Sequence, residues 1–343
     1  MKILGIETSC DETAAAIVED GTRILSSEVA SQSDIHEAFG GVVPEVAARS
    51  HIEVMLPTVK QALAAARVGW DEIDAIAVTQ GPGLIGSLLI GTLTAGTLAA
   101  LKHKPLIPVN HIQAHTYAGF LLPTPPSFPL LSLTASGSHT QLVLFRGHGD
   151  YLVLGKTLDD ACGEAFDKVA KMIGLSYPGG PEIELAAKVG NSNVFTFPKP
   201  KLGKDSLDFS FSGLKTAVLR AAQTAVGRDF RTPSHEIPAL LSAGQRNDIA
   251  ASFQKTTVTI LCDRLLQAYE RHSPASVIMA GGVAANQALR AEITKRLPVG
   301  VIYPPLNLCT DNAAMIASLG FFQYKNGRGQ SPLPIAPNPI LSM

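Results

Sequence analysis

Apolar residues alternate with polar or small residues near the N-terminus in a pattern that predicts a hairpin with a polar tip. The aliphatic run KILGIE is followed by the polar stretch Thr8 to Thr13 and then by AAAIVEDG. Strand, polar turn and strand in this order are typical of two antiparallel strands. A second run of this kind begins at Pro129, where PLLSLTASGSHTQLVLFRG has its own small polar tip at Ser136 to Thr140. We therefore expect the two tips to occupy corresponding places in a repeated unit.

Each half of the chain also predicts a strand that runs into a glycine-rich turn and a helix. The first is IDAIAVTQGPGLIGSLLIG, with Gly81 and Gly83, and the second is ASVIMAGGVAANQAL, with Gly281 and Gly282. Backbone N–H groups in such a turn can approach an anionic ligand at the positive end of the helix dipole. Two copies of one α/β plan could thus clamp a nucleotide between two lobes. The duplicated pattern resembles the actin, sugar-kinase and Hsp70-type nucleotide-binding fold.

The length and composition fit an α/β protein of two lobes. The chain has 343 residues, 46% of them hydrophobic, and a typical domain has roughly 100 to 200 residues. We expect an N-terminal lobe over residues 1–125, with a histidine-bearing helix near the lobe junction. The C-terminal lobe is expected over residues 126–343, with an inserted helical and partly basic region at about 160–250.

Cysteine usage and the N-terminus favour a cytoplasmic protein. The four cysteines, Cys10, Cys162, Cys262 and Cys309, are far apart and form no C-x-x-C pair. They predict neither a disulfide framework nor a zinc knuckle. The segment MKILGIETSCDE is too polar for a signal peptide, and we expect no later stretch to be apolar enough to span a bilayer.

One stretch of the chain is basic although the net charge of the whole is −1. Between Thr196 and Arg231 the basic residues are Lys199, Lys201, Lys204, Lys215, Arg220, Arg228 and Arg231, and the acids are Asp205, Asp208 and Asp229. This stretch either contacts nucleic-acid phosphates or is an ordinary solvated face.

Two histidines in PVNHIQAHTYAG are candidate metal ligands. Asn110 is a plausible N-cap for a helix that contains His111 and His115. At this i, i+4 spacing both imidazoles lie on one helix face about 6 Å apart, which suits two ligands of a single ion. Two ordinary histidines would show the same spacing. A zinc peptidase would normally have Glu directly after the first histidine, and Ile112 stands there instead.

A third ligand is expected from NLCTDNAAMIASLG near the C-terminus. Here Thr310 is predicted to be an N-cap and Asp311 to lie in the first helical turn, where the helix dipole favours a carboxylate. Capping alone would also explain this aspartate. Two histidines and a carboxylate with open positions are typical of iron sites and of catalytic zinc.

Nine motifs together resemble those of the tRNA adenosine threonylcarbamoyltransferase family, formerly described as glycopeptidases. They are GIETSCDET, GGVVPEVAAR, TQGPGLIGSLLIG, HIQAH, SGSHTQL, DDACGEAFDKVAKMIGLSYPGGP, FSFSGLKTA, AGGVAANQALR and CTDNAAMIA. They follow the family's order, and the match runs from about Lys2 to about Tyr324. The likeness is weakest between Ala221 and Asp248, and Ser138 stands where the family usually has glycine.

The resemblance implies a set of site residues. It implies one transition-metal ion per subunit, iron with zinc as the alternative, held by His111, His115 and Asp311. It implies further that Asp167 and Gly180 contact the nucleoside, that Glu184, where the family often has Asp, lies near the ribose, and that Asn286 contacts the adenine. The phosphate and acyl part of the substrate would contact Thr134, Ala135, Ser136, Gly137 and Ser138. From the residues alone, Asp167 could instead pair with Lys171 on a helix face, and Gly180 could belong to a plain turn.

The implied reaction transfers the threonylcarbamoyl group of threonylcarbamoyl-adenylate to the N6 amine of the adenosine immediately 3′ of the tRNA anticodon, releasing AMP. That amine is a poor nucleophile, so the site must stabilise charge on the carbonyl and on the departing AMP. Asp11 and Glu12 are candidates to accept the amine proton or to order water, although a polar hairpin turn would also explain them. The implied partners are tRNA, a catalytically silent paralogue of the same fold and a small P-loop ATPase.

Two other functions remain open at this point. A kinase or ATPase of the same fold would use an aspartate at the first hairpin and Mg²⁺ at the ATP phosphates. A non-catalytic scaffold paralogue would need none of these groups. The histidine pair favours the transferase, because neither alternative requires two histidines at i, i+4.

Overall fold

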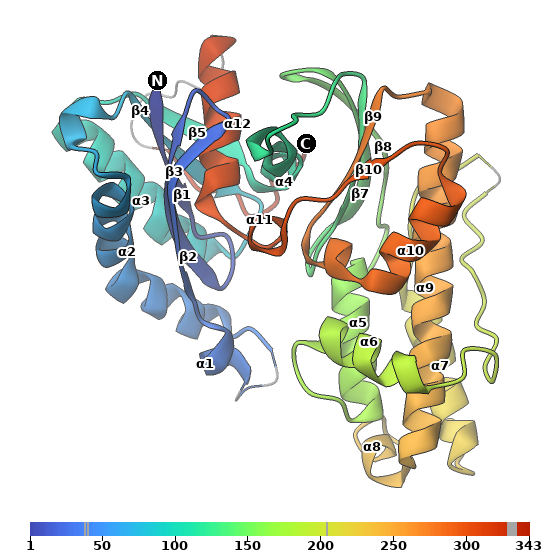
Figure 1. The fold of residues 1–343 in the computed structure, drawn as a ribbon. Helices are drawn as coiled ribbons and strands as arrows, with labels where there is room; N and C mark the ends of the chain where they lie inside the picture. The colour runs from blue at the N-terminus through green and yellow to red at the C-terminus, as the bar shows by residue number, and fades with distance from the viewer. Residues whose placement is uncertain (38, 40, 204, 328–334) are drawn as a thin grey trace. The chain divides into compact units, whose positions relative to one another are not determined.

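The computed structural model describes residues 1–37, 39, 41–203, 205–327 and 335–343. The chain divides into two compact units (Figure 1). Unit 1 comprises Met1–Ser127, Phe145–Tyr151 and Ile302–Met343, and unit 2 comprises Phe128–Leu144 and Leu152–Val301. All four cysteines are free thiols.

Unit 1 is built around a five-stranded sheet of order β3-β2-β1-β4-β5. Strand β1 pairs antiparallel with β2 and parallel with β4. The elements of unit 1 are β1 (Lys2–Glu7), β2 (Glu12–Glu19), β3 (Arg23–Ser31), α1 (Ser33–Glu37), α2 (Pro44–Ala66), η1 (Trp70–Glu72), β4 (Ala75–Gly81), α3 (Ile85–Lys102), β5 (Leu106–Asn110), α4 (His111–Tyr117), η2 (Ala118–Leu121), α11 (Leu306–Cys309) and α12 (Ala313–Lys325).

Helices cover both faces of this sheet. Helices α2 and α3 pack on one face, where buried side chains such as Leu4, Ile17 and Met55 form the core. Helix α12 packs against β1, β2 and β4 on the other face (Figure 1). There it approaches β1 so closely that a Cβ on Gly5 would overlap the backbone oxygen of Ala313. Glycine in the middle of β1 is therefore required by this close approach.

Unit 2 contains most of the second sheet, of order β10-β9-β6-β7-β8; the end of β7 and the start of β8, within Phe145–Tyr151, are grouped with unit 1. Its long helix α9 packs against α6, α7 and α10. The remaining elements are β6 (Leu130–Ala135), β7 (Thr140–Gly147), β8 (Asp150–Lys156), α5 (Cys162–Ile173), α6 (Gly179–Val189), α7 (Ser212–Ala225), α8 (Ile237–Leu240), α9 (Ala243–His272), β9 (Ser276–Ala280), η3 (Gly282–Ala285), α10 (Gln287–Arg296) and β10 (Val301–Ile302).

The two sheets follow one plan, which confirms the predicted duplication. Read from the other edge, the second sheet runs β8-β7-β6-β9-β10, which matches β3-β2-β1-β4-β5 strand for strand. The parallel pairing of β1 with β4 has its counterpart in the parallel pairing of β6 with β9. The tips between β1 and β2 and between β6 and β7 correspond, as do the glycine-rich turns after β4 and β9.

The C-terminal segment was expected to belong to the second lobe, within the range 126–343, but the structure groups it with the first. Residues 302–343 belong to unit 1. The physical reason is the apolar face of α12, which packs against β1, β2 and β4. The tail follows it, since Asn338 N–H donates to the Gln80 carbonyl at 2.8 Å.

The expectation that no stretch is apolar enough to span a bilayer needs correction for α3. This helix has the length and the hydropathy, 1.4 over 18 residues, of a membrane-spanning segment. A core helix of a soluble protein passes the same test, and α3 packs against β4 and α2. A third of the helix is buried, and part of the rest forms an exposed apolar face.

Candidate metal centre and substrate site

Helix α4 presents two histidines on one face, as predicted. Asn110 caps this helix, because its side chain accepts from the Gln113 N–H at 3.0 Å. Both imidazoles are buried, and their Nε2 atoms lie 3.2 Å apart. The rings meet edge to face with centroids 4.7 Å apart.

Asp311 lies outside the helix that it was expected to begin, so this prediction was wrong in detail. The N-cap of α12 is Asn312, whose side chain accepts from the Met315 N–H at 3.0 Å, and Thr310 ends α11 instead. Asn and Thr are both good N-caps, and the choice depends on where the preceding turn ends. Since Asn312 fills the cap, capping does not explain Asp311.

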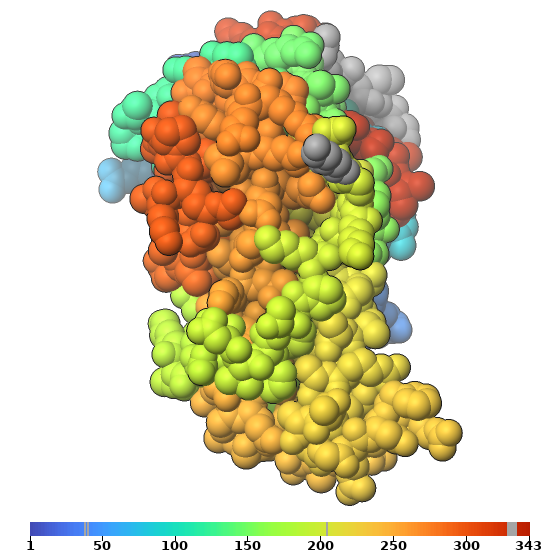
Figure 2. Space-filling view, turned by 90° about the vertical axis from the view of Figure 1, so that its right-hand side faces the viewer, coloured from blue at the N-terminus to red at the C-terminus, as the bar shows by residue number. Residues whose placement is uncertain are grey.

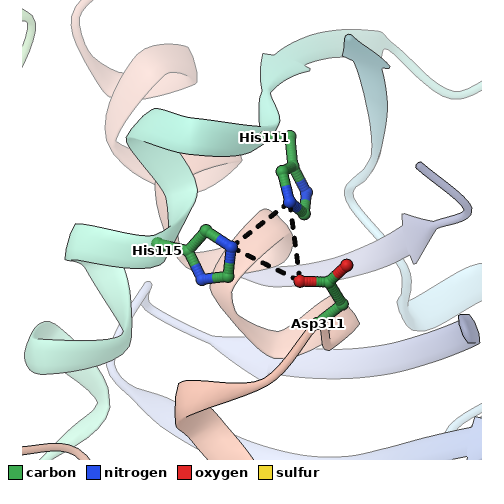
Figure 3. A group of neighbouring side chains, drawn as sticks. All are labelled: His111, His115 and Asp311. Carbon is green, nitrogen blue, oxygen red and sulfur yellow. Dashed lines mark hydrogen bonds and ion pairs between the residues drawn. The ribbon is translucent and has the colours of Figure 1, made fainter. Parts of the chain in front are cut away.

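The three expected ligands meet in unit 1 (Figure 3). Asp311 Oδ1 lies 3.5 Å from His111 Nε2 and 3.4 Å from His115 Nε2, and the two nitrogens are 3.2 Å apart. Ligands held tetrahedrally at roughly 2.0–2.1 Å from one metal ion lie about 3.3–3.4 Å from one another. All three sides of the triangle are close to that length, so the residues present fit a single transition-metal ion.

A buried carboxylate lies behind this triangle. Glu7 is fully buried at the end of β1, and its Oε2 is 2.9 Å from His111 Nδ1. Burial opposes ionisation of Glu7, but the neighbouring His111 outweighs it and lowers the pKa of the carboxyl. Burial disfavours protonation of His111, yet Glu7 and Asp311 raise the pKa of the metal-free imidazole to about 9. Both shifts favour the charged form of the pair while no metal ion is bound, and a bound ion would displace the proton from Nε2 and leave the one on Nδ1.

The two candidate catalytic acids lie at the tip between β1 and β2. Glu12 begins β2, and its Oε1 accepts from the Ser31 hydroxyl at 3.4 Å. Burial, together with the nearby Asp311 and Asp11 carboxylates, raises the pKa of Glu12 to about 9. Burial and the same acids also raise the pKa of the Cys10 thiol. The tip therefore carries two carboxyl groups, those of Asp11 and Glu12, close to Asp311 and the histidines.

In unit 2 the tip after β6 is fixed by backbone hydrogen bonds. Ser136 N–H donates to the His139 carbonyl at 2.8 Å, and Gly163 N–H donates to Ser136 O at 3.0 Å. Gly137 and Ser138 are exposed, while Ala135 and Thr134 are buried. The Thr134 hydroxyl has no hydrogen-bond partner among the described residues. A side chain at Gly163 would collide with the tip, so α5 begins directly beneath it.

The remaining residues expected to contact the substrate are on or next to helices that pack near this tip. Helix α5 packs against α6 and η3, and η3 packs against β6. Asp167 accepts from the Gly179 N–H at 2.7 Å and so fixes the turn that starts α6, where Gly180 follows. Glu184 accepts from the Gln287 N–H at 3.2 Å. Asn286 caps α10 and donates to Gln254 at 2.8 Å, so its side chain has structural contacts of its own.

The basic stretch is partly neutralised by acids of unit 2. Lys199 pairs with Asp263 at 2.7 Å and Lys215 pairs with Asp160 at 2.6 Å. Lys204 lies outside the described residues. Figure 2 shows the yellow segment around residues 220–235 at the surface of unit 2, where Arg228 and Arg231 are exposed.

Glu7 was not among the site residues predicted from the sequence. A glutamate at the end of the otherwise apolar run KILGIE could have indicated it, because a charged group in a buried strand requires a partner. That partner, His111, is on a different element, and only the tertiary structure of unit 1 brings the two together.

The chain is similar to proteins of one family over most of its length. The family described as tRNA N6-adenosine threonylcarbamoyltransferase matches residues 23–318. A protein of that name from Dehalococcoides mccartyi (strain CBDB1) is 49% identical and covers 100% of this chain and 99% of its own length. Another from Thermomicrobium roseum is 51% identical and covers 95% of this chain and 93% of its own length.

Solved structures of low sequence identity support the fold class. HypF of T. kodakarensis has a TM-score of 0.62 at 14% identity, over 96% of this chain and 48% of that one. The activator of 2-hydroxyisocaproyl-CoA dehydratase from Clostridium difficile has a TM-score of 0.51 at 14% identity, over 95% of this chain and 97% of that one. With the duplicated sheets, they confirm the expected nucleotide-binding fold. From the extent of the family match and the identity of its full-length relatives, the chain belongs to the tRNA N6-adenosine threonylcarbamoyltransferase family.

Proposed function

We propose that this transferase is metal-dependent and uses the histidine–aspartate cluster in tRNA modification. The acyl carbon of threonylcarbamoyl-adenylate forms a bond to N6 of the adenosine immediately 3′ of the anticodon. Its bond to the phosphate oxygen breaks, AMP leaves with that electron pair, and N6 loses a proton. The observation that carries the proposal is the triangle of His111, His115 and Asp311, with sides of 3.2–3.5 Å.

His111, His115 and Asp311 would hold one ion, and the donor set with open positions favours iron(II), with zinc as the alternative. When bound, such an ion acts as a Lewis acid toward a carbonyl or phosphoryl oxygen. Each imidazole would bind the ion through the lone pair on its Nε2 atom. Asp311 supplies the carboxylate charge that a divalent ion requires.

Asp11 and Glu12 are the proposed groups for the amine proton. Without a bound ion the pKa of Glu12 is raised to about 9, so its ionised form, a stronger base than an ordinary glutamate, is the minor form at neutral pH. A cation held beside Asp311 would favour the ionised form that can accept a proton. Asp11 lies beside it and contributes to that shift. Both belong to the tip at the end of β1, the strand whose Glu7 contacts His111.

The adenylate is proposed to bind unit 2 at the tip after β6. Backbone N–H groups of the exposed Gly137 and Ser138 can donate to the phosphate and to the developing oxyanion. The orphan Thr134 hydroxyl offers a further donor. Asp167, Gly180, Glu184 and Asn286 remain the proposed contacts for the nucleoside.

We also propose that the protein acts in the cytoplasm on an anticodon loop whose unpaired bases are accessible. Arg228 and Arg231 are exposed on unit 2 and suit phosphate contacts. Lys199 is less suited, because Asp263 already neutralises it. Neither a kinase nor a silent scaffold is favoured, since the relatives are named as transferases.

The direct test is transfer of labelled threonylcarbamate. Iron-loaded protein, with its partner subunits, is expected to place one label on each tRNA and to release one AMP per label. A tRNA carrying guanosine at the target position should accept none, because guanine has an oxygen at C6 in place of the N6 amine. Label on both tRNAs, or adenylate hydrolysis with no label on either, would contradict the proposed reaction.

The apolar face on α2 and α3 is the proposed docking surface for the paralogue. We define it by Ile52, Leu56, Ile85, Leu89 and Leu93, whose side chains are 40–62% exposed. The two helices pack together, and a Cβ on Gly86 would meet Ala48. A chain of the same fold carries two equivalent helices, so two such faces can pack as a four-helix layer.

Ile52→Glu combined with Leu89→Glu is expected to abolish the complex with the paralogue, because each charge would be buried in the interface. Light scattering after gel filtration measures the complex, and Lys60→Glu, also exposed on α2, is the matched control. Metal content should be unchanged in both variants. If the wild type alone is a dimer that the double variant breaks, then a second copy of this chain occupies the face, and the paralogue does not.

A further inference from the structure

Glu7 is fully buried, and every polar group that contacts it in the described residues is a donor or can be one. The Ser9 N–H donates to Oε1, and the Thr79 hydroxyl donates to Oε2 at 2.6 Å. His111 Nδ1 is 2.9 Å from Oε2. These groups come from the β1–β2 tip, from β4 and from the start of α4. Glu7 therefore joins three elements through one carboxylate.

The two nitrogens of His111 face different partners. Nδ1 is directed to Glu7, and Nε2 is directed to His115 and Asp311. A neutral imidazole carries its proton on only one nitrogen, so a hydrogen bond at Nδ1 leaves the lone pair on Nε2. His115 differs, because its buried Nδ1 has no partner among the described residues. Of these two histidines, only His111 contacts a carboxylate that can fix its tautomer.

We propose that Glu7 is a positioning residue that holds His111 with Nδ1–H toward the carboxylate and the Nε2 lone pair toward the metal. The inference rests on the metal centre of the proposed function and extends it to a residue that is not itself a ligand. Partners that orient a ligating histidine commonly change metal affinity by about 10- to 100-fold.

A glutamine at this position cannot reproduce these contacts. If its oxygen faces His111 and Thr79, its NH₂ group points at the Ser9 N–H, and two donors oppose each other. If it is turned round, the NH₂ group donates to His111 Nδ1 and moves the ring proton to Nε2, where a metal cannot bind. Glu7→Gln thus changes the hydrogen-bond chemistry while it keeps the size of the side chain.

The experiment uses Co²⁺ as the probe with the full-length metal-free protein, because its visible spectrum also reports the ligand set. We expect Glu7→Gln to weaken Co²⁺ binding by about 10- to 100-fold in competition with a chelator. Glu7→Ala should do at least the same. Ser9→Ala tests the other polar neighbour of His111 Nδ1, the Ser9 hydroxyl at 3.2 Å, and should have a smaller effect. Glu19→Gln, at the partly exposed far end of β2, is the matched control.

The outcomes distinguish a wrong role for Glu7 from a wrong metal centre. Glu7→Gln with the affinity and Co²⁺ spectrum of the wild type would overturn the positioning role, even if its melting temperature fell. A larger loss in Ser9→Ala than in Glu7→Gln would assign the role to Ser9 and overturn it as well. If the wild type binds neither Co²⁺, Fe²⁺ nor Zn²⁺, the metal centre itself fails and the inference fails with it.

Discussion

Replacing both His111 and His115 with alanine is expected to lower bound metal from about one ion per chain to none and to abolish threonylcarbamate transfer. The two imidazoles supply two of the three ligand atoms in the triangle, and Asp311 alone offers one carboxylate. A single carboxylate does not retain a transition metal against water. Elemental analysis of the purified protein and the labelled transfer assay measure the two losses.

The fold should survive this change, because Asn110 still caps α4 and alanine is the best helix former. Asp311→Ala should lose metal less completely, since both imidazoles remain. His235→Ala, which removes an exposed histidine of unit 2, is the control for a general effect of losing histidine. Full metal occupancy in the double variant would show that the ion, if there is one, has other ligands.

Gly281→Ala is expected to destabilise unit 2 by about 3 kcal/mol and to reduce adenylate binding. Gly281 has φ = +87°, and a non-glycine residue in such a conformation costs roughly 1–3 kcal/mol. Its new Cβ would also overlap the backbone oxygen of Ala135 at the end of β6. Displacing Ala135 moves the tip that is proposed to hold the phosphate. At about 2–4 °C per kcal/mol, the melting temperature of unit 2 should fall by roughly 6–12 °C.

The neighbouring glycine provides a matched control. A Cβ on Gly282 meets nothing within 4 Å, and Gly282 has no positive φ. Gly282→Ala should therefore change the melting temperature little. Thermal shifts with AMP at about 100 times its dissociation constant, worth about 2.7 kcal/mol in the wild type, measure binding in each variant. Equal melting temperatures and equal AMP shifts in the two variants would refute the argument.

The sequence by itself determined the elements whose signals are local. Alternation in KILGIE and PLLSLTA specifies strands, and the polar runs after them specify tips, because side chains in a strand alternate between two faces. Asn110 before His111 specified a capped helix with both imidazoles on one side, since the cap and the i, i+4 spacing lie within two turns. The duplicated order of tips and glycine-rich turns predicted the duplicated sheets.

Only the tertiary structure decided how distant segments combine. Thr310 and Asn312 are both competent caps, and the end of α11 decided between them, which left Asp311 to face the histidines. The packing of α12 on β1 brought the C-terminal segment into unit 1, and the same unit placed Glu7 against His111. No local pattern indicated that Lys199 forms an ion pair, because its partner Asp263 lies on the distant helix α9. Local patterns depend on neighbours in the chain, whereas ligands and ion pairs depend on which surfaces bury each other, and no short stretch of sequence contains that information.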